Sequence, residues 1–345
     1  MLLLNRREVE TLLDLDRLIE ALGPAMAELS AGRISMPARS VTLVREGHGL
    51  LAAMPVYRDS TRTLSAKLVS VFPENQGNGV PSHQAVMLVF DAETGSPLAL
   101  MDGTYITAVR TAAGSALSAH LLAPPDANVL LIIGSGVQAR SHARAIPRVR
   151  PIREIRVIGR NPQKAAKLAA EISQQQGIRA FVCAAVEQSF AGAQIICAAT
   201  HAAEPVVKGG WLQPGAHVTS VGLNPQGREV DTEAVMKSLV VVETREAALA
   251  SGLGGSNELK WPIREGLITE AHIHAEVGEI VAGSKPGRTS AEQITLYKSV
   301  GVAVQDAVAA QLVLEAARRQ GVGREFEIDF RAKEKSLEFG AGGAP

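Results

Sequence analysis

The sequence predicts an α/β protein in which a doubly wound parallel sheet is joined to a second, α+β domain containing an antiparallel meander. Three observations predict this class. Between about residues 40 and 101, five short apolar runs follow one another with brief connections, as in a meander. From about residue 126 to 295, nearly all-apolar strands alternate with helical segments, which indicates a parallel sheet covered on both faces. A chain of 345 residues is long enough for about two such domains.

The N-terminal part is expected to be helical over residues 6–32, because apolar residues recur there at helical spacing. The expected strands of the meander are VTLVRE, GLLAAMPVYR, TLSAKLVSVF, HQAVMLVFD and SPLALMD, separated by turn clusters near 47–49, 59–62, 73–81 and 92–95. A long helix of small residues is expected from Thr104 to about Leu122. Pro124 and Pro125 then interrupt the chain.

The alternating region predicts strands at 128–134, 154–159, 179–184, 193–199, 216–222 and 239–243. A helix should begin at Pro162, with Asn161 as its N-cap, and run to about Gln176. The segment 295–319 is expected to be one helix that packs back onto the first domain. We therefore divide the chain into one domain made of 1–124 and 300–330, a second of 125–299, and a flexible tail at 331–345.

The strand–turn–helix segment around residue 134 carries the clearest chemical signal. The apolar run Val129–Ile133 ends on Gly134-Ser-Gly136-Val-Gln-Ala139, and residues of helical character follow. Gly134 permits the tight turn, Gly136 lets the backbone approach a pyrophosphate, and the helix N-terminus offers free N–H groups. A second strand follows at the expected distance. The sequence thus predicts a Rossmann dinucleotide site.

The end of the second strand favours NADP(H), with NAD(H) remaining possible. An NAD site usually has Asp or Glu there to bind the ribose 2′-hydroxyl. This strand instead ends at Gly159 and continues Arg160-Asn161-Pro-Gln-Lys164, without a carboxylate. Arg160 and Lys164 could hold a 2′-phosphate. Alternatively, both are solvated charges at the start of a helix.

Three cations lie in apolar surroundings within the first domain. Arg39 follows Met36-Pro-Ala, Lys67 lies inside LSAKLVSVF, and Arg110 lies in a helix of Ala, Thr and Val. Each alone is compatible with an ordinary surface position, since strands alternate their faces. Together, beside a redox cofactor, they suit a substrate carboxylate, because the guanidinium fork binds carboxylates in two-pronged fashion.

Composition excludes several classes of function. With 35 basic and 35 acidic residues the formal net charge is zero, so there is no electrostatic case for a nucleic acid or a membrane surface. No apolar run approaches the roughly 20 residues that span a bilayer. The start MLLLNRREVE is too short and too quickly charged for a signal peptide. Cys183 and Cys197 are expected to be free thiols. We expect a cytoplasmic protein with no metal site.

Five long segments carry a resemblance to a known family. They are KLVSVFPENQGNGVPSHQ (67–84), FDAETGSPLALMDGTYITAVRTAA (90–113), GSGVQARSHARA (134–145), GAHVTSVGLNPQGREVD (215–231) and GEIVAGSKPGRTSAEQITLYKSVGVAVQDAVAA (278–310). In these the chain resembles the ornithine cyclodeaminase/mu-crystallin family over nearly its whole length. The resemblance implies a Rossmann domain plus a dimerisation domain built from the N-terminal part and the last helix, and hence a homodimer.

The resemblance also implies roles for individual residues. Arg39, Lys67 and Arg110 match the positions that hold the substrate carboxylate. Ser82, His83, Thr111 and Ser299 match positions near the nicotinamide and the phosphates, although His83 could equally be structural, and the two serines could simply start a strand and a helix. The other expected cofactor contacts are Gly134, Ser135, Gly136, Val137, Gln138, Arg160, Asn161, Lys164, Thr200, Val221, Leu223 and Asn224.

Two departures from the family pattern bear on the reaction. Ornithine cyclodeaminases have an Asp two residues after a Val-Gly, where this chain has Val221-Gly222-Leu-Asn224. An amide cannot accept a proton as a carboxylate does. Their acidic residue just before a Met-Pro is also missing from Leu51-Ala-Ala-Met54-Pro55. Asp231 could substitute in part, but its setting predicts an N-cap.

These departures favour the ketimine reductase branch. The expected reaction reduces Δ1-pyrroline-2-carboxylate or Δ1-piperideine-2-carboxylate with NAD(P)H to L-proline or L-pipecolate. The imine nitrogen could arrive protonated, or receive a proton from Lys67 directly or through water if the arginines depress the pKa of Lys67. Three alternatives stay open: ornithine cyclodeamination, an alanine dehydrogenase-like reductive amination, and a non-catalytic protein that binds a small ligand.

Overall fold

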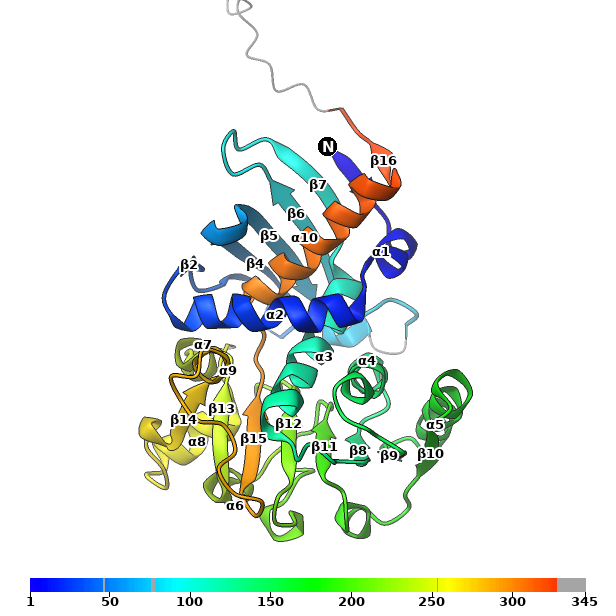
Figure 1. Ribbon diagram of the computed structural model, residues 1–345, viewed down its shortest axis with the longest axis vertical. Coiled ribbons are helices and arrows are strands. Elements are labelled where there is room, and N and C mark those ends of the chain that lie inside the picture. The colour runs from blue at the N-terminus through cyan, green and yellow to red at the C-terminus, as the bar shows by residue number, and fades with distance from the viewer. Residues whose placement is uncertain (46, 76–77, 253, 328–345) are drawn as a thin grey trace, which may run out of the picture.

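The computed structural model describes residues 1–45, 47–75, 78–252 and 254–327. Within these ranges the chain forms two eight-stranded sheets, one above the other in Figure 1. The predicted α/β class is confirmed. The expected flexible tail at 331–345 lies outside the described residues.

The upper sheet contains the predicted meander. Its strands run in the order β16-β1-β7-β6-β5-β4-β2, with β3 also paired to β4. Their bounds are β1 (Leu2–Leu4), β2 (Ile34–Ser35), β3 (Ser40–Val44), β4 (Gly49–Arg58), β5 (Thr63–Val71), β6 (His83–Phe90), β7 (Pro97–Asp102) and β16 (Arg324–Glu325). From β3 to β7 each strand is antiparallel to the next, and β1 joins β7 in parallel. Burial alternates along β5, so Lys67 lies on its buried face.

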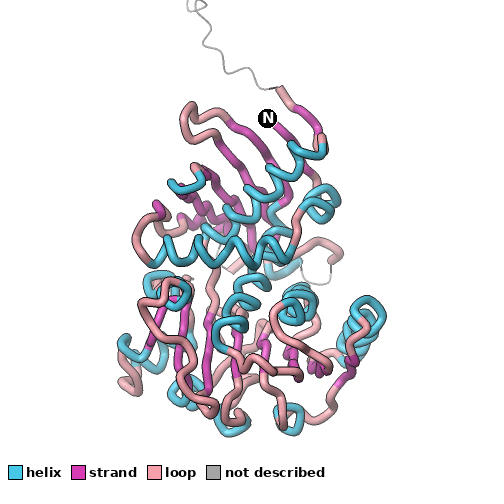
Figure 2. Tube along the Cα trace, in the orientation of Figure 1, coloured by secondary structure: helices cyan, strands magenta, loops and turns pink. Residues whose placement is uncertain are grey.

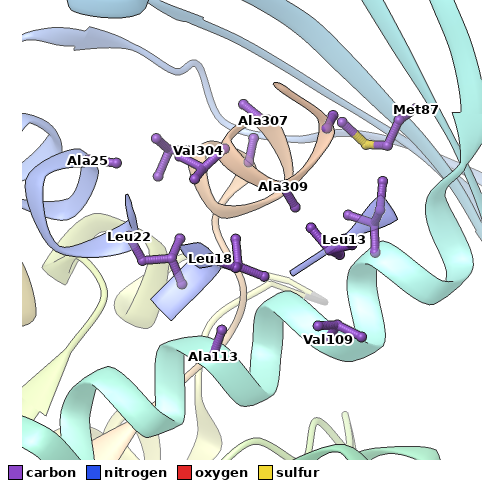
Figure 3. Close-up of a cluster of buried hydrophobic side chains, with 14 of the residues drawn as sticks. Leu13, Leu18, Leu22, Ala25, Met87, Val109, Ala113, Val304, Ala307 and Ala309 are labelled. Carbon is purple, nitrogen blue, oxygen red and sulfur yellow. The ribbon is translucent and has the colours of Figure 1, made fainter. Parts of the chain in front are cut away.

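Three helices contact the strands of this sheet, α1 (Arg6–Leu12), α3 (Gly103–Leu122) and α10 (Ala303–Gln320), and α2 (Leu15–Ser30) packs on α3 and α10. The stretch 6–32 is helical, as predicted, and forms two helices. The side chain of Asn5 caps α1, and that of Asp14 caps α2 and starts a new helix axis. Leu18 and Leu22 of α2, Ala113 of α3 and Val304 of α10 meet in one apolar cluster (Figure 3).

The lower sheet is parallel throughout, in the order β10-β9-β8-β11-β12-β15-β13-β14. Its strands are β8 (Val129–Ile133), β9 (Glu154–Ile158), β10 (Arg179–Val182), β11 (Ile195–Ala198), β12 (His217–Ser220), β13 (Ser238–Val242), β14 (Ile273–Glu276) and β15 (Ile294–Lys298). All six predicted strands are present, and β14 and β15 are additional. The expectation of one helix over 295–319 is wrong at its start, because Ile294–Lys298 is an inner strand and α10 begins at Ala303.

Helices lie along the parallel sheet and alternate with its strands (Figure 2). They are α4 (Val137–Ala145), α5 (Pro162–Gln176), α6 (Thr232–Lys237), α7 (Arg245–Leu249), α8 (Asn257–Arg264) and α9 (Val277–Val281). Short 3-10 helices occupy 59–61, 73–75, 146–148, 187–190, 209–211 and 270–272. Among the helices of the described ranges, none combines the length and the apolarity needed to cross a membrane.

The order of the parallel strands reverses between β8 and β11. The chain leaves β8 toward β9 on one side and later returns to β11 on the other, which is the switch point at which such sheets bind ligands. The strand β15 leads directly into α10, which packs on β4 and β5 of the upper sheet. The carboxyl ends of the parallel strands therefore face the meander.

Candidate active site

A buried carboxylate joins two of the predicted cations. Lys67 Nζ lies 2.7 Å from Asp306 Oδ2, and Arg110 Nε lies 3.0 Å from Asp306 Oδ1. Arg110 also donates from a terminal nitrogen to Gln305 Oε1 at 2.9 Å. Lys67, Arg110 and Asp306 are at most 5% exposed. Burial disfavours the charge on Asp306, but Arg110 and Lys67 outweigh it and hold the pKa of Asp306 below its ordinary value.

Arg39 reaches the same region from the loop before β3. Its guanidinium donates to the carbonyls of Val300 at 3.2 Å and Gly301 at 2.8 Å. Burial lowers its pKa, Glu243 and Asp306 oppose this, and the nearby positive charge of Arg110 lowers it further. The structure thus brings the three predicted cations together.

The three cations and the two carboxylates near them can bind one further anion. Three cations face the carboxylates of Asp306 and Glu243, so one positive charge is in excess. A buried excess charge is costly unless a partner neutralises it. A substrate with a single carboxylate supplies that partner.

Lys67 can exchange a proton near neutral pH. Burial, together with the charges of Arg110 and Arg39, lowers the pKa of Lys67 to about 8, although Asp306 opposes the shift. His83 opens β6 beside this cluster, and burial and the charges of Lys67 and Arg110 lower its pKa to about 4. His83 is therefore neutral at pH 7.

The sheet around Lys67 is apolar. In register with Lys67 lie Met54 on β4 and Met87 on β6, and all three share the buried face. The neighbouring buried row is Ala52, Val69 and Ala85. Of the two residues before Met54, only Ala52 is buried on this face. No carboxylate from these two rows can therefore meet a substrate ammonium group.

A second buried carboxylate fixes the loop between β15 and α10. Glu243 accepts hydrogen bonds from Ser299 Oγ at 2.9 Å, Val300 N at 2.8 Å and Gly301 N at 2.7 Å. This loop supplies the carbonyls that hold Arg39. The predicted cofactor contact Ser299 thus uses its hydroxyl to bind Glu243.

The glycine loop after β8 has a backbone that requires glycine at one position and open space at another. Gly134 has φ +128°, and a Cβ there would lie 2.4 Å from the carbonyl oxygen of Ala199, so only glycine fits. A Cβ at Gly136, the N-cap of α4, would meet nothing within 4 Å. No side chain of the described residues caps α4, and Gln138 Oε1 is buried without a partner there. Free N–H groups beside open space suit a pyrophosphate.

The chain matches the model of the "Ornithine cyclodeaminase/mu-crystallin family" over residues 1–321. The chain belongs to this family. It is 40% identical to ketimine reductase mu-crystallin of Rattus norvegicus over 303 residues, which cover 87% of this chain and 91% of the relative. These findings confirm the family that the sequence motifs predicted.

Two solved structures of named enzymes share this fold. Thermococcus litoralis Δ1-pyrroline-2-carboxylate reductase, in complex with NADH and L-proline, is 42% identical, with a TM-score of 0.90 over 94% of this chain and all of that chain. An archaeal alanine dehydrogenase dimer with bound NAD is 32% identical, with a TM-score of 0.88 over 95% of this chain and 99% of that chain.

Several residues that were predicted to contact the cofactor form hydrogen bonds within the protein. Asn161 caps α5 through the backbone N–H of Lys164, as predicted, while Arg160 and Lys164 are exposed. Thr111 donates its hydroxyl to the carbonyl of Thr107. The carbonyl of Ser82 accepts a hydrogen bond from Phe72 N.

The side chain of Asn224 also serves the chain itself. Its amide donates to the carbonyls of His201 at 3.4 Å and Ala202 at 3.1 Å, and its oxygen accepts from Gln226 N. Asp231 caps α6, as predicted. The other expected contacts lie along the strand ends: Ser135 beside Gly159, exposed Val137 at the start of α4, Val221 bonded to Ala198, and Leu223, which is 37% exposed.

Three buried acids that organise the site were missed in the sequence: Asp306, Glu243 and Glu229. Asp306 stands in a mostly apolar helix, VGVAVQDAVAA, and Glu243 directly follows the apolar strand SLVVV, whereas Glu229 lies in the polar stretch NPQGREVD. An acid in an apolar helix is rarely buried without a cation partner, and this was the available signal. Among the described residues, no three His, Cys, Asp or Glu side chains gather into a metal site.

Proposed function

We propose that this protein is an NAD(P)H-dependent reductase of cyclic imine carboxylates, giving L-proline from Δ1-pyrroline-2-carboxylate or L-pipecolate from Δ1-piperideine-2-carboxylate. The observation that carries the proposal is the buried group of three cations with one excess positive charge, set opposite a dinucleotide loop. Relatives named as ketimine and Δ1-pyrroline-2-carboxylate reductases support it.

Arg39, Lys67 and Arg110 bind the substrate carboxylate. Asp306 and Gln305 occupy Nε and one terminal nitrogen of Arg110, which orients the guanidinium plane. The apolar rows around Met54 and Val69 accept the hydrocarbon ring of an imine better than the ammonium group of ornithine.

A reduced nicotinamide cofactor, which the glycine loop after β8 would hold, would supply the hydride for the imine carbon. The nitrogen gains one proton, for which Lys67 is the donor, directly or through one water. With its pKa at about 8, Lys67 is mostly protonated at pH 7 and can release the proton. Asp306 then stays paired with Arg110, so no lone carboxylate is left buried.

The deciding assay follows oxidation of NADPH and NADH with both cyclic imines, and with oxoacids plus ammonia. We expect oxidation with an imine in the absence of ammonia. Strict dependence on ammonia would instead identify an alanine dehydrogenase-like enzyme, and ammonia release from L-ornithine would identify a cyclodeaminase. No oxidation with any imine contradicts the proposal.

The substitution Arg110→Ala tests the carboxylate site. Loss of a buried, hydrogen-bonded cation should raise the KM for the imine by about a hundredfold, with NADPH affinity nearly unchanged. Steady-state kinetics and fluorescence titration of NADPH measure the two effects separately. An unchanged KM would remove Arg110 from the site.

We also propose a preference for NADPH over NADH. The end of β9 has Arg160 in place of a carboxylate, with Lys164 one turn into α5, and both side chains are exposed. Replacing both by Ala should lower the ratio of kcat/KM for NADPH to that for NADH by about tenfold. The control Lys167→Ala, also exposed on α5, should leave the ratio unchanged.

The upper sheet supports a proposal of homodimerisation by the domain that comprises 1–124 and the last helix. The face of β4–β6 opposite Lys67 carries two exposed apolar side chains, Leu51 at 47% and Val86 at 40% exposure. Contiguous exposed apolar side chains of this kind mark interaction surfaces. The related alanine dehydrogenase is a dimer.

A further inference from the structure

Glu229 is a buried carboxylate that receives four hydrogen bonds. Its Oε1 accepts from Thr200 N at 2.5 Å and Thr200 Oγ1 at 2.7 Å. Its Oε2 accepts from Ser220 Oγ at 2.9 Å and Gly222 N at 2.7 Å. The residue is 2% exposed. One side chain therefore fixes the ends of the adjacent parallel strands β11 and β12.

These strand ends lie beside the glycine loop. The carbonyl of Ala199, next to Thr200, is the atom that a Cβ at Gly134 would strike. A Cβ at Gly222 would lie 2.3 Å from Glu229 Cδ, so the second loop approaches the carboxylate as closely as a glycine allows. In a doubly wound sheet, one half binds each nucleotide. In the proposed function, the half with β8, β9 and Arg160 binds the ribose that carries the 2′-phosphate. The nicotinamide half of the cofactor would then bind at the ends of β11 and β12.

The cluster beneath these loops has a net charge. Lys298 Nζ donates to Ser220 Oγ at 3.0 Å and to the Gly222 carbonyl at 2.6 Å. It lies 3.3 Å from Glu258 Oε1, which also accepts the N–H of Glu229. Two carboxylates and one ammonium group, each at most 3% exposed, leave one negative charge in excess.

We propose that Glu229 is a positioning residue that holds the Thr200 and Gly222 loops in the form that binds the nicotinamide, and that its charge favours the oxidised cofactor over the reduced one. The oxidised ring carries one more positive charge than the reduced ring. A nearby buried negative charge therefore stabilises it selectively, because the interior screens charge weakly. This inference rests on the proposed function and concerns the same cofactor site.

The first test is Glu229→Gln, assayed by binding rather than turnover. The amide has nearly the same shape but cannot accept from Gly222 N–H with its nitrogen, and it removes the charge. The dissociation constant for NADPH, from fluorescence titration, should rise by about tenfold. The dissociation constant for NADP⁺, measured by calorimetry, should rise further. The ratio of the dissociation constant for NADP⁺ to that for NADPH should therefore increase at least about threefold.

Two variants separate position from charge. Glu229→Asp keeps the charge but shortens the side chain, so both dissociation constants should rise while their ratio stays at the wild-type value. Glu258→Gln removes a charge from the same cluster without touching Thr200, so the ratio should increase as in Glu229→Gln. This second variant also tests the charge if Glu229→Gln does not fold.

Asp231→Asn is the matched control. Two residues after Glu229, the carboxylate of Asp231 also accepts backbone N–H groups, from Ala234 at 2.8 Å and Gly209 at 3.0 Å, but at the start of α6. It should lower the melting temperature and leave both dissociation constants unchanged.

Three outcomes would overturn the inference. If the ratio of the two dissociation constants is unchanged in both Glu229→Gln and Glu258→Gln, the role of charge is overturned. If both dissociation constants are unchanged in Glu229→Gln and Glu229→Asp, the positioning role is overturned. Equal effects in Asp231→Asn and Glu229→Gln reduce Glu229 to a general structural residue. If the protein binds these cofactors but reduces no imine, the proposed function fails while the inference stands.

Discussion

At the scale of single residues, Gly301 shows how one backbone conformation supports several functional groups. It has φ +79°, donates its N–H to Glu243 and accepts Arg39 on its carbonyl. A Cβ there would lie 3.0 Å from both terminal nitrogens of Arg110. The residue thus links two of the cations to a buried acid, and its missing side chain leaves space for the guanidinium.

Gly301→Ala should therefore damage substrate binding as well as stability. The left-handed backbone should cost about 1 kcal/mol, and the displaced Arg110 should raise the KM for the imine by about tenfold. Chemical denaturation and steady-state kinetics measure these effects. Gly321→Ala is the control, because Gly321 has φ +65° but nothing within 4 Å of its Cβ. An equal KM change in both variants would contradict a contact effect on Arg110.

At the scale of elements, α3 is the helix that joins the two sheets. Small residues let it pack closely, and it carries Arg110 near the meander and two serines near the parallel sheet. Ser115 Oγ lies 2.9 Å from His142 Nε2, whose Nδ1 donates to the carbonyl of Gln138. Ser118 Oγ lies 3.3 Å from His217 Nε2. The helix is thus held to α4 through buried His142 and to β12 of the parallel sheet through buried His217.

These histidines predict a loss of stability in mild acid. Burial lowers the pKa of His142 to about 4 and that of His217 to about 3, against 6.5 in the unfolded chain. Below pH 6.5 these histidines become protonated in the unfolded chain but stay neutral in the folded protein. The free energy of unfolding therefore falls as the pH drops toward 4. At pH 5 each should cost about 2 kcal/mol.

Urea unfolding at pH 7, 6 and 5 measures how the free energy of unfolding depends on pH. In His217→Asn this dependence should be weaker by the contribution of one histidine. His120→Asn, which alters an exposed histidine of α3, should leave this pH dependence unchanged. Equal slopes in wild type and His217→Asn would contradict the assignment.

At the scale of the whole molecule, the two sheets have unequal surroundings. The parallel sheet is covered on both faces by separate apolar clusters. The meander has helices over the face that bears Lys67, while side chains such as Leu51 and Val86 on its other face are exposed. An open apolar sheet face is costly in water, and a second copy of the chain would cover it.

Light scattering should therefore give the mass of a dimer for the wild-type protein and that of a monomer for the double variant Leu51→Asp/Val86→Asp. Two buried charges per subunit would outweigh the gain from apolar contact. Leu267→Asp, at a 51% exposed site after α8, should remain dimeric. A monomeric wild-type protein would contradict the proposed interface.

The meander, the glycine loop and the helix caps at Asn161 and Asp231 could be predicted, because each depends on neighbours within a few residues. The segment Ile294–Lys298 could not. A five-residue stretch, ITLYK, that lies shortly before a helix fits either structure, and pairing with β12 and β13 makes it a strand.

By itself, the sequence determined the fold class, the glycine loop after β8 and the three cations, since strand period, glycine spacing and charge in apolar surroundings are local properties. Only the tertiary structure decided which acids meet these groups: Asp306 beside Lys67 and Arg110, Glu243 under Gly301, and Glu229 between β11 and β12. The reason is physical. A buried ion is stable only with partners from other elements, and packing alone brings these together.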